Sequence, residues 1–285
     1  MALLPPEFLD TVVAIGIGDN PNSRHWIGTG FIFGNLMKKN MEDGKNSYHL
    51  WLITNKHVFE GQKEIYLKFN SLQNPDSKDY YVSLLFDNGR PRWVGHPSKS
   101  IDIAAIALNP KVLRDEDRLF FYFRSDQNLF SKDEMVAQKI SEGDRIFVLG
   151  FPMGLVDKER QYVICRGGYI ARIRDYLEDR TNDYLIDALV FPGNSGGPVI
   201  LCPAPFSLKG TTSINRAVLI GIVKAYIPYR DVAVSPQTRA ARILFQENSG
   251  LAAVESASSI LETVQIASRR MKERIARAQR RANKK

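Results

Sequence analysis

Short runs of β-branched, aromatic and other apolar residues, separated by turn residues, recur along the chain as far as about Tyr226. Runs of this length between Gly, Pro, Asn and Asp residues are typical of β-strands. They cover residues 12–17, 30–33, 50–54, 65–69 and 101–108, followed by 145–149, 162–165, 184–189, 198–201 and 217–223. The pattern does not alternate strands with helices, as a parallel sheet would require. We therefore predict an all-β barrel or sandwich architecture.

Three polar stretches interrupt these runs. Residues 111–140 are charged and weakly periodic, and Ser131 to Glu134 precede a short helical pattern, so we interpret this stretch as the connection between two β units. Residues 38–47 and 70–79 are rich in Asn, Asp and Lys, which is typical of hairpin loops.

The pattern changes after about Ser249, where apolar residues are separated by three, four or seven positions. These residues are Leu251, Val254, Leu261, Val264, Met271 and Ile275. They predict a C-terminal amphipathic α-helix with Gly250 near its start. Its first half is nearly uncharged and is expected to pack on the body, whereas its basic second half is expected to project into solvent. The predicted domains are a β unit at 1–110, a connection at 111–140, a second β unit at 141–235 and the helix with its basic tail at 236–285.

The net charge of +8 is concentrated at the C-terminus. Between Ile266 and Lys285 nine Lys or Arg residues accompany one acid, Glu273, so the rest of the chain is close to neutral. The basic tail fits a solvated helix end, a contact with a regulatory protein or another copy of the chain, or binding to nucleic acid or an acidic membrane. The last is possible but not favoured. No aromatic residue is interleaved among the tail arginines, so base stacking is not supported.

Cysteine and histidine usage gives no sign of a metal or a disulfide framework. Cys165 and Cys202 show no repeated spacing, and the four histidines are not spaced as ligands on one helix or turn. No cofactor is expected. The chain lacks a basic leader before its first acid, Glu7, and an apolar run of membrane-spanning length. Together with the missing disulfide pattern, these features favour a cytoplasmic location.

The segment from Phe191 to Pro198 reads Phe-Pro-Gly-Asn-Ser-Gly-Gly-Pro and places one serine, Ser195, among glycines on a tight turn. A nucleophilic serine needs a base to take its proton, a carboxylate to orient that base, and backbone donors for the oxyanion. The backbone N–H groups of Gly193 and Ser195 are the natural donors, because glycine allows the orientation that such a site requires.

The base and the carboxylate have candidates upstream of Ser195. His57 follows the apolar run 50–54, where a side chain can face a cleft. Asp102 opens the apolar run of residues 101–108, where a carboxylate would be costly to bury without a partner such as a histidine N–H. Asp87, Asp157 and Asp187 are weaker candidates, because none opens a buried strand in this way.

The ordered set of motifs resembles the trypsin-like serine peptidases of the chymotrypsin fold, especially the bacterial branch that includes the high-temperature-requirement proteases. The matching segments are Gly28 to Phe31, Thr54 to Val58, Asp102 to Ala104, Gly150 to Gly154, Arg166 to Ile170, Asp187-Ala188, Gly193 to Pro198 and Gly221 to Val223. The resemblance implies two packed antiparallel six-stranded β-barrels with a His57–Asp102–Ser195 triad in the cleft between them. It also implies a protein or peptide substrate.

Two departures from the family pattern carry information. Secreted digestive members have an acid before the nucleophile, which pairs with a newly cut N-terminus, but this chain has Asn194 there. Activation by N-terminal cleavage is therefore not expected. The usual disulfides of the family are also missing, which agrees with the expected cytoplasmic location. No peptide-binding second domain, of the kind that often follows proteases of the bacterial branch, is recognisable in the sequence.

The resemblance also suggests where a substrate binds. Leu189, six residues before the nucleophile, would form the floor of the primary specificity pocket and disfavours cleavage after Lys or Arg. Small or medium apolar residues before the scissile bond are expected instead. Ile222, Val223 and Lys224 would pair with the substrate backbone by β-addition. The loop from Pro152 to Gln161 is a candidate for gating by a partner.

Two functions from different classes remain open. The first is a serine endopeptidase that works through an acyl-enzyme intermediate. The second is a non-catalytic interaction module on the same fold, which would use its cleft or its basic helix. The presence of all three triad residues favours the endopeptidase, and an esterase would share this chemistry but would need a different pocket.

Overall fold

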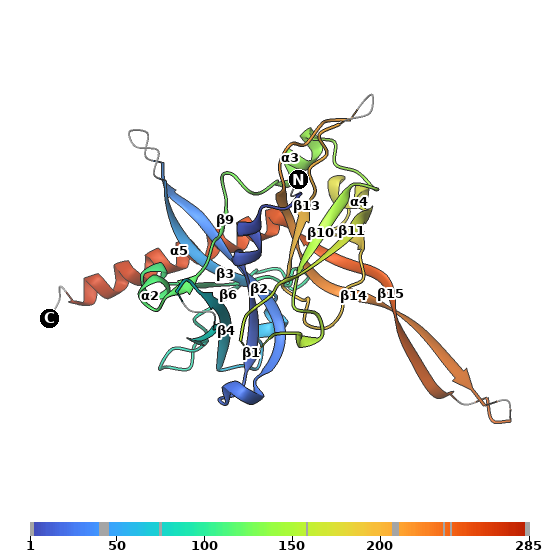
Figure 1. Ribbon diagram of the computed structural model, residues 1–285, viewed down its shortest axis with the longest axis horizontal. Helices are drawn as coiled ribbons and strands as arrows, with labels where there is room; N and C mark the ends of the chain where they lie inside the picture. The colour runs from blue at the N-terminus through green and yellow to red at the C-terminus, as the bar shows by residue number, and fades with distance from the viewer. Residues whose placement is uncertain are drawn as a thin grey trace.

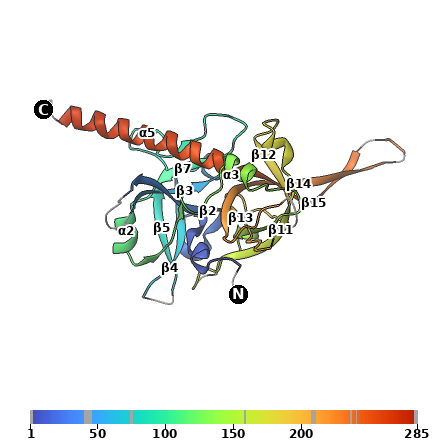
Figure 2. The ribbon, with the colours of Figure 1, turned by 90° about the horizontal axis from the view of Figure 1, so that it is seen from above.

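The computed structural model describes residues 3–39, 46–73, 76–157, 159–206, 211–235, 237–239 and 241–282. Two β units lie side by side, and one long helix, α5, runs across them and extends past the first unit (Figure 1, Figure 2). A two-stranded arm projects on the opposite side from the end of that helix (Figure 1).

The first unit is a curved sheet in the strand order β5-β4-β1-β2-β3-β7-β6. Its strands are β1 (Val12–Ile17), β2 (His25–Lys38), β3 (Ser47–Thr54), β4 (Glu64–Ser71), β5 (Lys78–Ser83), β6 (Val94–Gly95) and β7 (Ala104–Ala107), with β8 (Arg118–Leu119) on β4 and β9 (Phe123–Arg124) on β2. Its short helical segments are η1 (Pro6–Thr11), η2 (Pro21–Ser23), α1 (Lys56–Phe59) and α2 (Pro110–Asp115).

The second unit is a closed barrel in the order β10-β11-β12-β15-β14-β13. Its strands are β10 (Arg145–Gly150), β11 (Ile164–Arg172), β12 (Asp183–Asp187), β13 (Pro198–Leu201), β14 (Val218–Val234) and β15 (Ala241–Ser256). The helices α3 (Lys132–Ala137), η3 (Pro152–Gly154) and α4 (Arg174–Leu177) connect them. Helix α3 begins at Lys132, earlier than the predicted start after Glu134, because Ser131 and Glu134 form a capping box.

The all-β class and the C-terminal helix are confirmed, but the first unit differs from the predicted closed barrel. No ladder among the described residues joins β5 to β6, and only an isolated bridge between Leu85 and Pro91 connects the segments beside them. The sequence predicts a hairpin loop at residues 70–79, but Lys78 and Asp79 belong to β5. They pair with Phe69 and Lys68 of β4.

The predicted start of the C-terminal helix is wrong. Residues 241–256 form β15, which pairs with β12 and β14 and closes the second barrel, so this barrel does not end at 235. Leu251 and Val254 fit a helical spacing as well as a strand, and short apolar runs do not distinguish the two. The alternation of buried Ala252 and Val254 with less buried Ala253 is the strand period.

Three apolar clusters fill the protein. One fills the first unit, one fills the second barrel, and the third joins both units and includes the inner face of α5. The helix (Ala257–Ala282) contributes Ile260, Val264 and Ala267 to this third cluster. From Lys272 to Arg280 every residue of α5 is exposed, as predicted for its basic half. Among the described residues, no helix is long and apolar enough to span a membrane.

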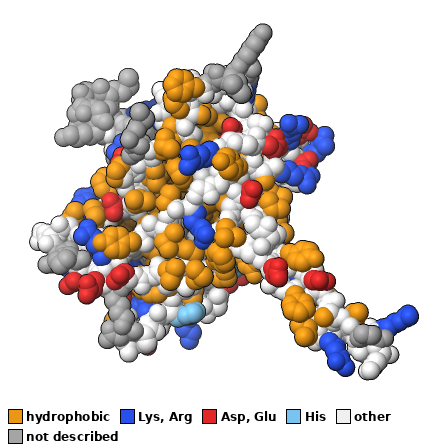
Figure 3. Space-filling model, turned by 45° about the vertical axis from the view of Figure 1, so that its right-hand side comes forward, with side chains coloured by type: hydrophobic (Ala, Val, Ile, Leu, Met, Phe, Trp, Pro, Cys, Tyr) orange, Lys and Arg blue, Asp and Glu red, His pale blue; other side chains and the backbone are white. Residues whose placement is uncertain are grey.

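The arm is formed by the outer parts of β14 and β15, paired from Pro228–Asn248 to Val234–Ala241. It carries large apolar side chains that are exposed to solvent, among them Tyr229, Val232, Ile243 and Phe245. Figure 3 shows hydrophobic side chains along the arm at the lower right, with basic side chains near its tip.

The packing of α5 predicts that Ile260→Ala will lower the free energy of unfolding by about 2–5 kcal/mol, because Ile260 is fully buried between the two units. Ile275→Ala on the exposed half of the same helix is the matched control and should cost about 0.5 kcal/mol or less. Urea unfolding measures both. Equal losses would contradict the packing described here.

Candidate active site

Two consecutive tight turns shape the segment around Ser195. The first is closed by a hydrogen bond from Asn194 N–H to Phe191 O (3.0 Å), with Pro192 in its second position and Gly193 at φ 97° in its third. The second is closed by a hydrogen bond from Gly197 N–H to Asn194 O (2.8 Å), with Gly196 at φ 85°. A positive φ in the third position of a turn favours glycine, which explains both glycines.

The glycines also avoid clashes with neighbouring backbone. A side chain at Gly193 would collide with Phe151 O, and one at Gly196 would collide with Thr29 O. The N–H groups of Gly193 and Ser195 donate to no hydrogen bond among the described residues, whereas the flanking Asn194 and Gly196 N–H groups both do. Two unpaired N–H groups therefore lie next to the Ser195 side chain, as an oxyanion site requires.

His57 lies in the short helix α1 and pairs with Asp102. The distance between His57 Nδ1 and Asp102 Oδ2 is 2.6 Å. An ionised carboxylate only accepts hydrogen bonds, so Nδ1 is the donor in this contact, and in a neutral imidazole Nε2 is then the acceptor. The His57 side chain is 48% exposed, so the ring is accessible from solvent.

The backbone and the carboxylate of Asp102 are both held in place. Asp102 Oδ1 accepts from the N–H groups of Lys56 (2.8 Å) and His57 (3.3 Å). The Asp102 N–H donates to Glu255 Oε1 (2.9 Å), and Asp102 O accepts from Asn55 Nδ2 (2.7 Å). Glu255 comes from β15 of the second barrel, so the backbone of Asp102 is held by the second unit and its carboxylate by the first.

Glu255 is fully buried, and a cation accompanies it. Lys224 Nζ lies 3.0 Å from Glu255 Oε1 and 3.0 Å from Asp183 Oδ2, and it donates to Ser100 O (3.0 Å). Burial alone would lower the pKa of Lys224, but its hydrogen bonds and ion pairs with Glu255 and Asp183 raise it. Burial raises the pKa of Glu255, against the hydrogen bonds from the Asp102 N–H and Lys224. The raised pKa of Lys224 therefore reflects the pairing, whereas that of Glu255 reflects burial.

Thr29 of β2 connects the first unit to the nucleophile segment. Its hydroxyl donates to Gly193 O (2.6 Å) and accepts from the Phe151 N–H (3.1 Å). Its own N–H donates to Ser195 O (2.9 Å), and Thr29 O accepts from the Thr54 hydroxyl (2.7 Å). Thr29 is fully buried, so these bonds are shielded from water. Thr29 fixes the turn that carries Ser195 against the strands that lead to His57.

The structure brings Ser195 close to the segment that carries His57. A Cβ added to Gly28 would lie 3.1 Å from the Val58 side chain and 3.5 Å from Ser195 O, and Val58 directly follows His57. The Ser195 hydroxyl makes no hydrogen bond within the described parts of the chain, to His57 or to any other residue. The predicted triad residues therefore lie at the junction of the two units. Of the expected contacts between them, the described residues form the His57–Asp102 hydrogen bond but not one between Ser195 and His57.

The predicted substrate-binding residues differ in how available they are to a ligand. Leu189 is 43% exposed, so its side chain is accessible from solvent. Val223 N–H and O already bond to Gly197 O (2.8 Å) and Gly196 N–H (3.0 Å), and Ile222 pairs with Pro198 and Glu255. Neither of these two backbones is free for β-addition, because barrel closure uses them.

The free edge of β14 begins at Lys224, the residue after Val223. The ladder between β13 and β14 ends at the pair Pro198–Ile222. Among the described residues, β14 then continues with β15 on one side only, at Ala225–Ala253 and Tyr226–Ala252. Lys224, Ala225 and Tyr226 therefore offer an open sheet edge next to Ser195. The side chain of Lys224 is committed to Glu255 and Asp183 and does not point to an edge ligand.

Sequence reasoning missed three residues that position the site. Thr29 lay in a quoted motif but had no assigned role, and Asn55 and Glu255 were not singled out. A buried Glu in an apolar stretch is a signal that could have identified Glu255, since such a carboxylate needs partners.

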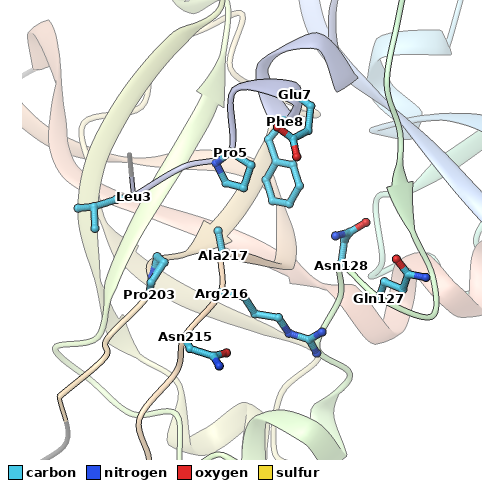
Figure 4. A pocket seen from close by; sticks show the side chains of 10 residues that line it. All are labelled: Leu3, Pro5, Glu7, Phe8, Gln127, Asn128, Pro203, Asn215, Arg216 and Ala217. Atoms are coloured by element: carbon cyan, nitrogen blue, oxygen red, sulfur yellow. The ribbon is translucent and has the colours of Figure 1, made fainter. Parts of the chain in front are cut away.

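A separate cavity of about 490 Å³ lies between the N-terminal segment and the residues before β14. Figure 4 shows Phe8 on one side of it and Arg216 on another. None of its lining residues belongs to the predicted triad or oxyanion site.

A curved sheet and a closed barrel, with a glycine-flanked serine and a His–Asp pair at their junction, define a protein of the chymotrypsin-like fold class. A family model for the trypsin-like peptidase domain matches residues 28–202. This range covers more than half of the chain, so the chain belongs to the trypsin-like peptidase family. The family supports a function of the serine-protease type. Among curated proteins, none matches the chain.

The contacts of Thr29 predict that Thr29→Val will lower stability by about 2–4 kcal/mol, because it leaves the buried Gly193 O and Phe151 N–H without their partner. We expect catalytic efficiency to fall about a hundredfold, since the oxyanion donors and Ser195 lose their anchor. Thr29→Ser keeps the hydroxyl and is the matched control. Unfolding curves and initial rates measure the two effects, and equal behaviour of the two variants would contradict this role.

Proposed function

We propose that the protein is a serine endopeptidase that hydrolyses peptide bonds through an acyl-enzyme intermediate. Ser195 is the nucleophile, His57 the general base, Asp102 the group that orients the imidazole, and the N–H groups of Gly193 and Ser195 bind the oxyanion. The single observation that supports the proposal is the pair of unpaired N–H groups on the Ser195 turn, which lies close to the segment that carries His57.

The chemistry follows from these positions. With its proton on Nδ1, His57 has Nε2 free to accept the proton of the Ser195 hydroxyl as the oxygen attacks the substrate carbonyl. The carbonyl oxygen becomes an oxyanion that receives two backbone hydrogen bonds, and His57 then gives the proton to the leaving amine. Water repeats the sequence to release the acyl group. Asp102 stabilises the imidazolium that forms in each half-reaction.

We propose that the substrate backbone pairs with the open edge of β14 at Lys224 to Tyr226. An extended peptide added there would continue the antiparallel sheet, and β-addition supplies main-chain hydrogen bonds without a sequence requirement. The non-catalytic alternative would use this same edge without cleavage.

We also propose that the segment Pro152 to Gln161 couples activity to a partner. Met153 N–H donates to Pro192 O (2.6 Å), directly before Gly193, and Met153 and Leu155 are exposed on the outside of this segment. A partner that binds these side chains would act on the turn that bears the oxyanion donors.

An alkyl fluorophosphonate probe tests the proposed nucleophile, because it reacts with a serine only where a base and an oxyanion site are aligned. We expect labelling of the wild type and of Ser213→Ala, whose serine is exposed outside the site, and no labelling of Ser195→Ala. Ser195→Ala should also lower kcat by about a million-fold. An unlabelled wild type, with intact folding by circular dichroism, would favour the non-catalytic module.

Cleavage of a peptide library tests specificity. We expect cuts after small or medium apolar residues, because Leu189 offers no carboxylate to pair with a basic side chain. Mass spectrometry of the products identifies the residue before each cut. Dominant cleavage after Lys or Arg would refute this specificity without affecting the proposed nucleophile.

A further inference from the structure

The outer half of α5 and the segment Phe86–Gly95 enclose an open groove of about 1060 Å³. Two arginines from the segment, Arg90 and Arg92, line one wall, and three from the helix, Arg270, Arg274 and Arg277, line the other. Asp87 is the one acidic residue among the lining residues of this groove. We call this feature the arginine groove.

The five guanidinium groups are available to a ligand. All five residues are exposed, and none forms an ion pair with a carboxylate among the described residues. The five like charges around the groove repel each other. A bound anion would relieve this electrostatic repulsion. The charge of the groove therefore complements a polyanion.

The geometry of the groove fits an extended chain of anions. Arg270, Arg274 and Arg277 are spaced i, i+4 and i+7, so they lie on one face of α5 over about 10 Å of its axis. The Arg274 guanidinium lies 4.0 Å from the centroid of Phe86, and the Arg92 guanidinium lies 5.7 Å from it. This aromatic ring orients two of the guanidiniums from opposite walls, which lowers the entropy lost on binding.

We propose that the arginine groove binds the phosphodiester backbone of nucleic acid without sequence preference. All five cations of the groove are arginines, whose planar guanidinium matches phosphate oxygens in a bidentate manner. An acidic membrane fits less well, because a helix at a membrane surface needs an apolar face. Among the described residues of α5, Ile275 is the only large apolar side chain that is exposed.

The structure also removes the objection that the sequence raised. No aromatic residue is interleaved among the tail arginines, but the fold brings Phe86 and Trp93 from a distant segment to line the same groove. The proposal does not depend on the peptidase activity, and its test uses binding alone.

The test measures the fluorescence anisotropy of labelled 20-nucleotide DNA, single-stranded and duplex, with the full chain. If five phosphates of the single strand are contacted, raising the salt from about 50 to 200 mM should weaken binding about a hundredfold. The double variant Arg270→Glu/Arg274→Glu should weaken binding at least about tenfold at the lower salt and flatten the salt dependence.

Arg230→Glu/Arg242→Glu is the matched control, because it makes the same change in net charge on the exposed strands of the arm. It should change affinity by less than about twofold, whereas equal weakening by both pairs would show that overall charge and not the groove drives binding. Thermal unfolding verifies that both variants are folded. The proposal is overturned by absence of binding to either DNA, or by selective binding to anionic phospholipid vesicles or poly-glutamate in place of DNA at the same salt.

Discussion

The hydrogen bonds of Thr29 are the constraint on which the site depends. Its hydroxyl and backbone reach Gly193, Ser195, Phe151 and Thr54, and these four residues lie on both sides of the junction between the units. Because these bonds are fully buried, a displaced partner would be left unsatisfied, which costs more than the bond itself contributes. The position of the Ser195 turn relative to the strands that lead to His57 is thus set by buried polar groups, and an apolar cluster surrounds the junction.

Asp102 is likewise held by hydrogen bonds from both units. The N–H groups of Lys56 and His57 in the first unit hold its carboxylate, whereas Glu255 of the second unit accepts a hydrogen bond from its backbone N–H, so Asp102 is held by both units. Glu255 is itself buried and depends on Lys224, whose ammonium also reaches Ser100 and Asp183. A buried charge of this kind lowers stability. It positions Asp102, however, because an apolar residue in its place could not accept a hydrogen bond from the Asp102 N–H.

The sequence predicted what local chemistry determines. The turn around Ser195, a short helix near residues 131–134 and the apolar runs of most strands follow from residue type and spacing. Relations between distant segments could not be predicted in this way. Residues 251–256 fit either a helix or a strand until β12 and β14 flank them, and Val223 became unavailable to a substrate because Gly196 and Gly197 use its backbone. Glu255 and Thr29 acquire their roles only from partners more than a hundred residues away.

The basic C-terminus is another case in which the fold changes the meaning of a pattern. Read as a sequence, it is a tail of like charges, and a flexible tail loses much conformational entropy on binding. In the structure, Ile260 and Val264 anchor α5 in the apolar cluster between the units, and His96 contacts Glu262 at 3.0 Å. The arginines that follow are therefore carried on a helix whose direction is fixed. A preorganised row of cations opposite Arg90 and Arg92 binds an extended polyanion at a smaller entropic cost than the same residues would on a free chain.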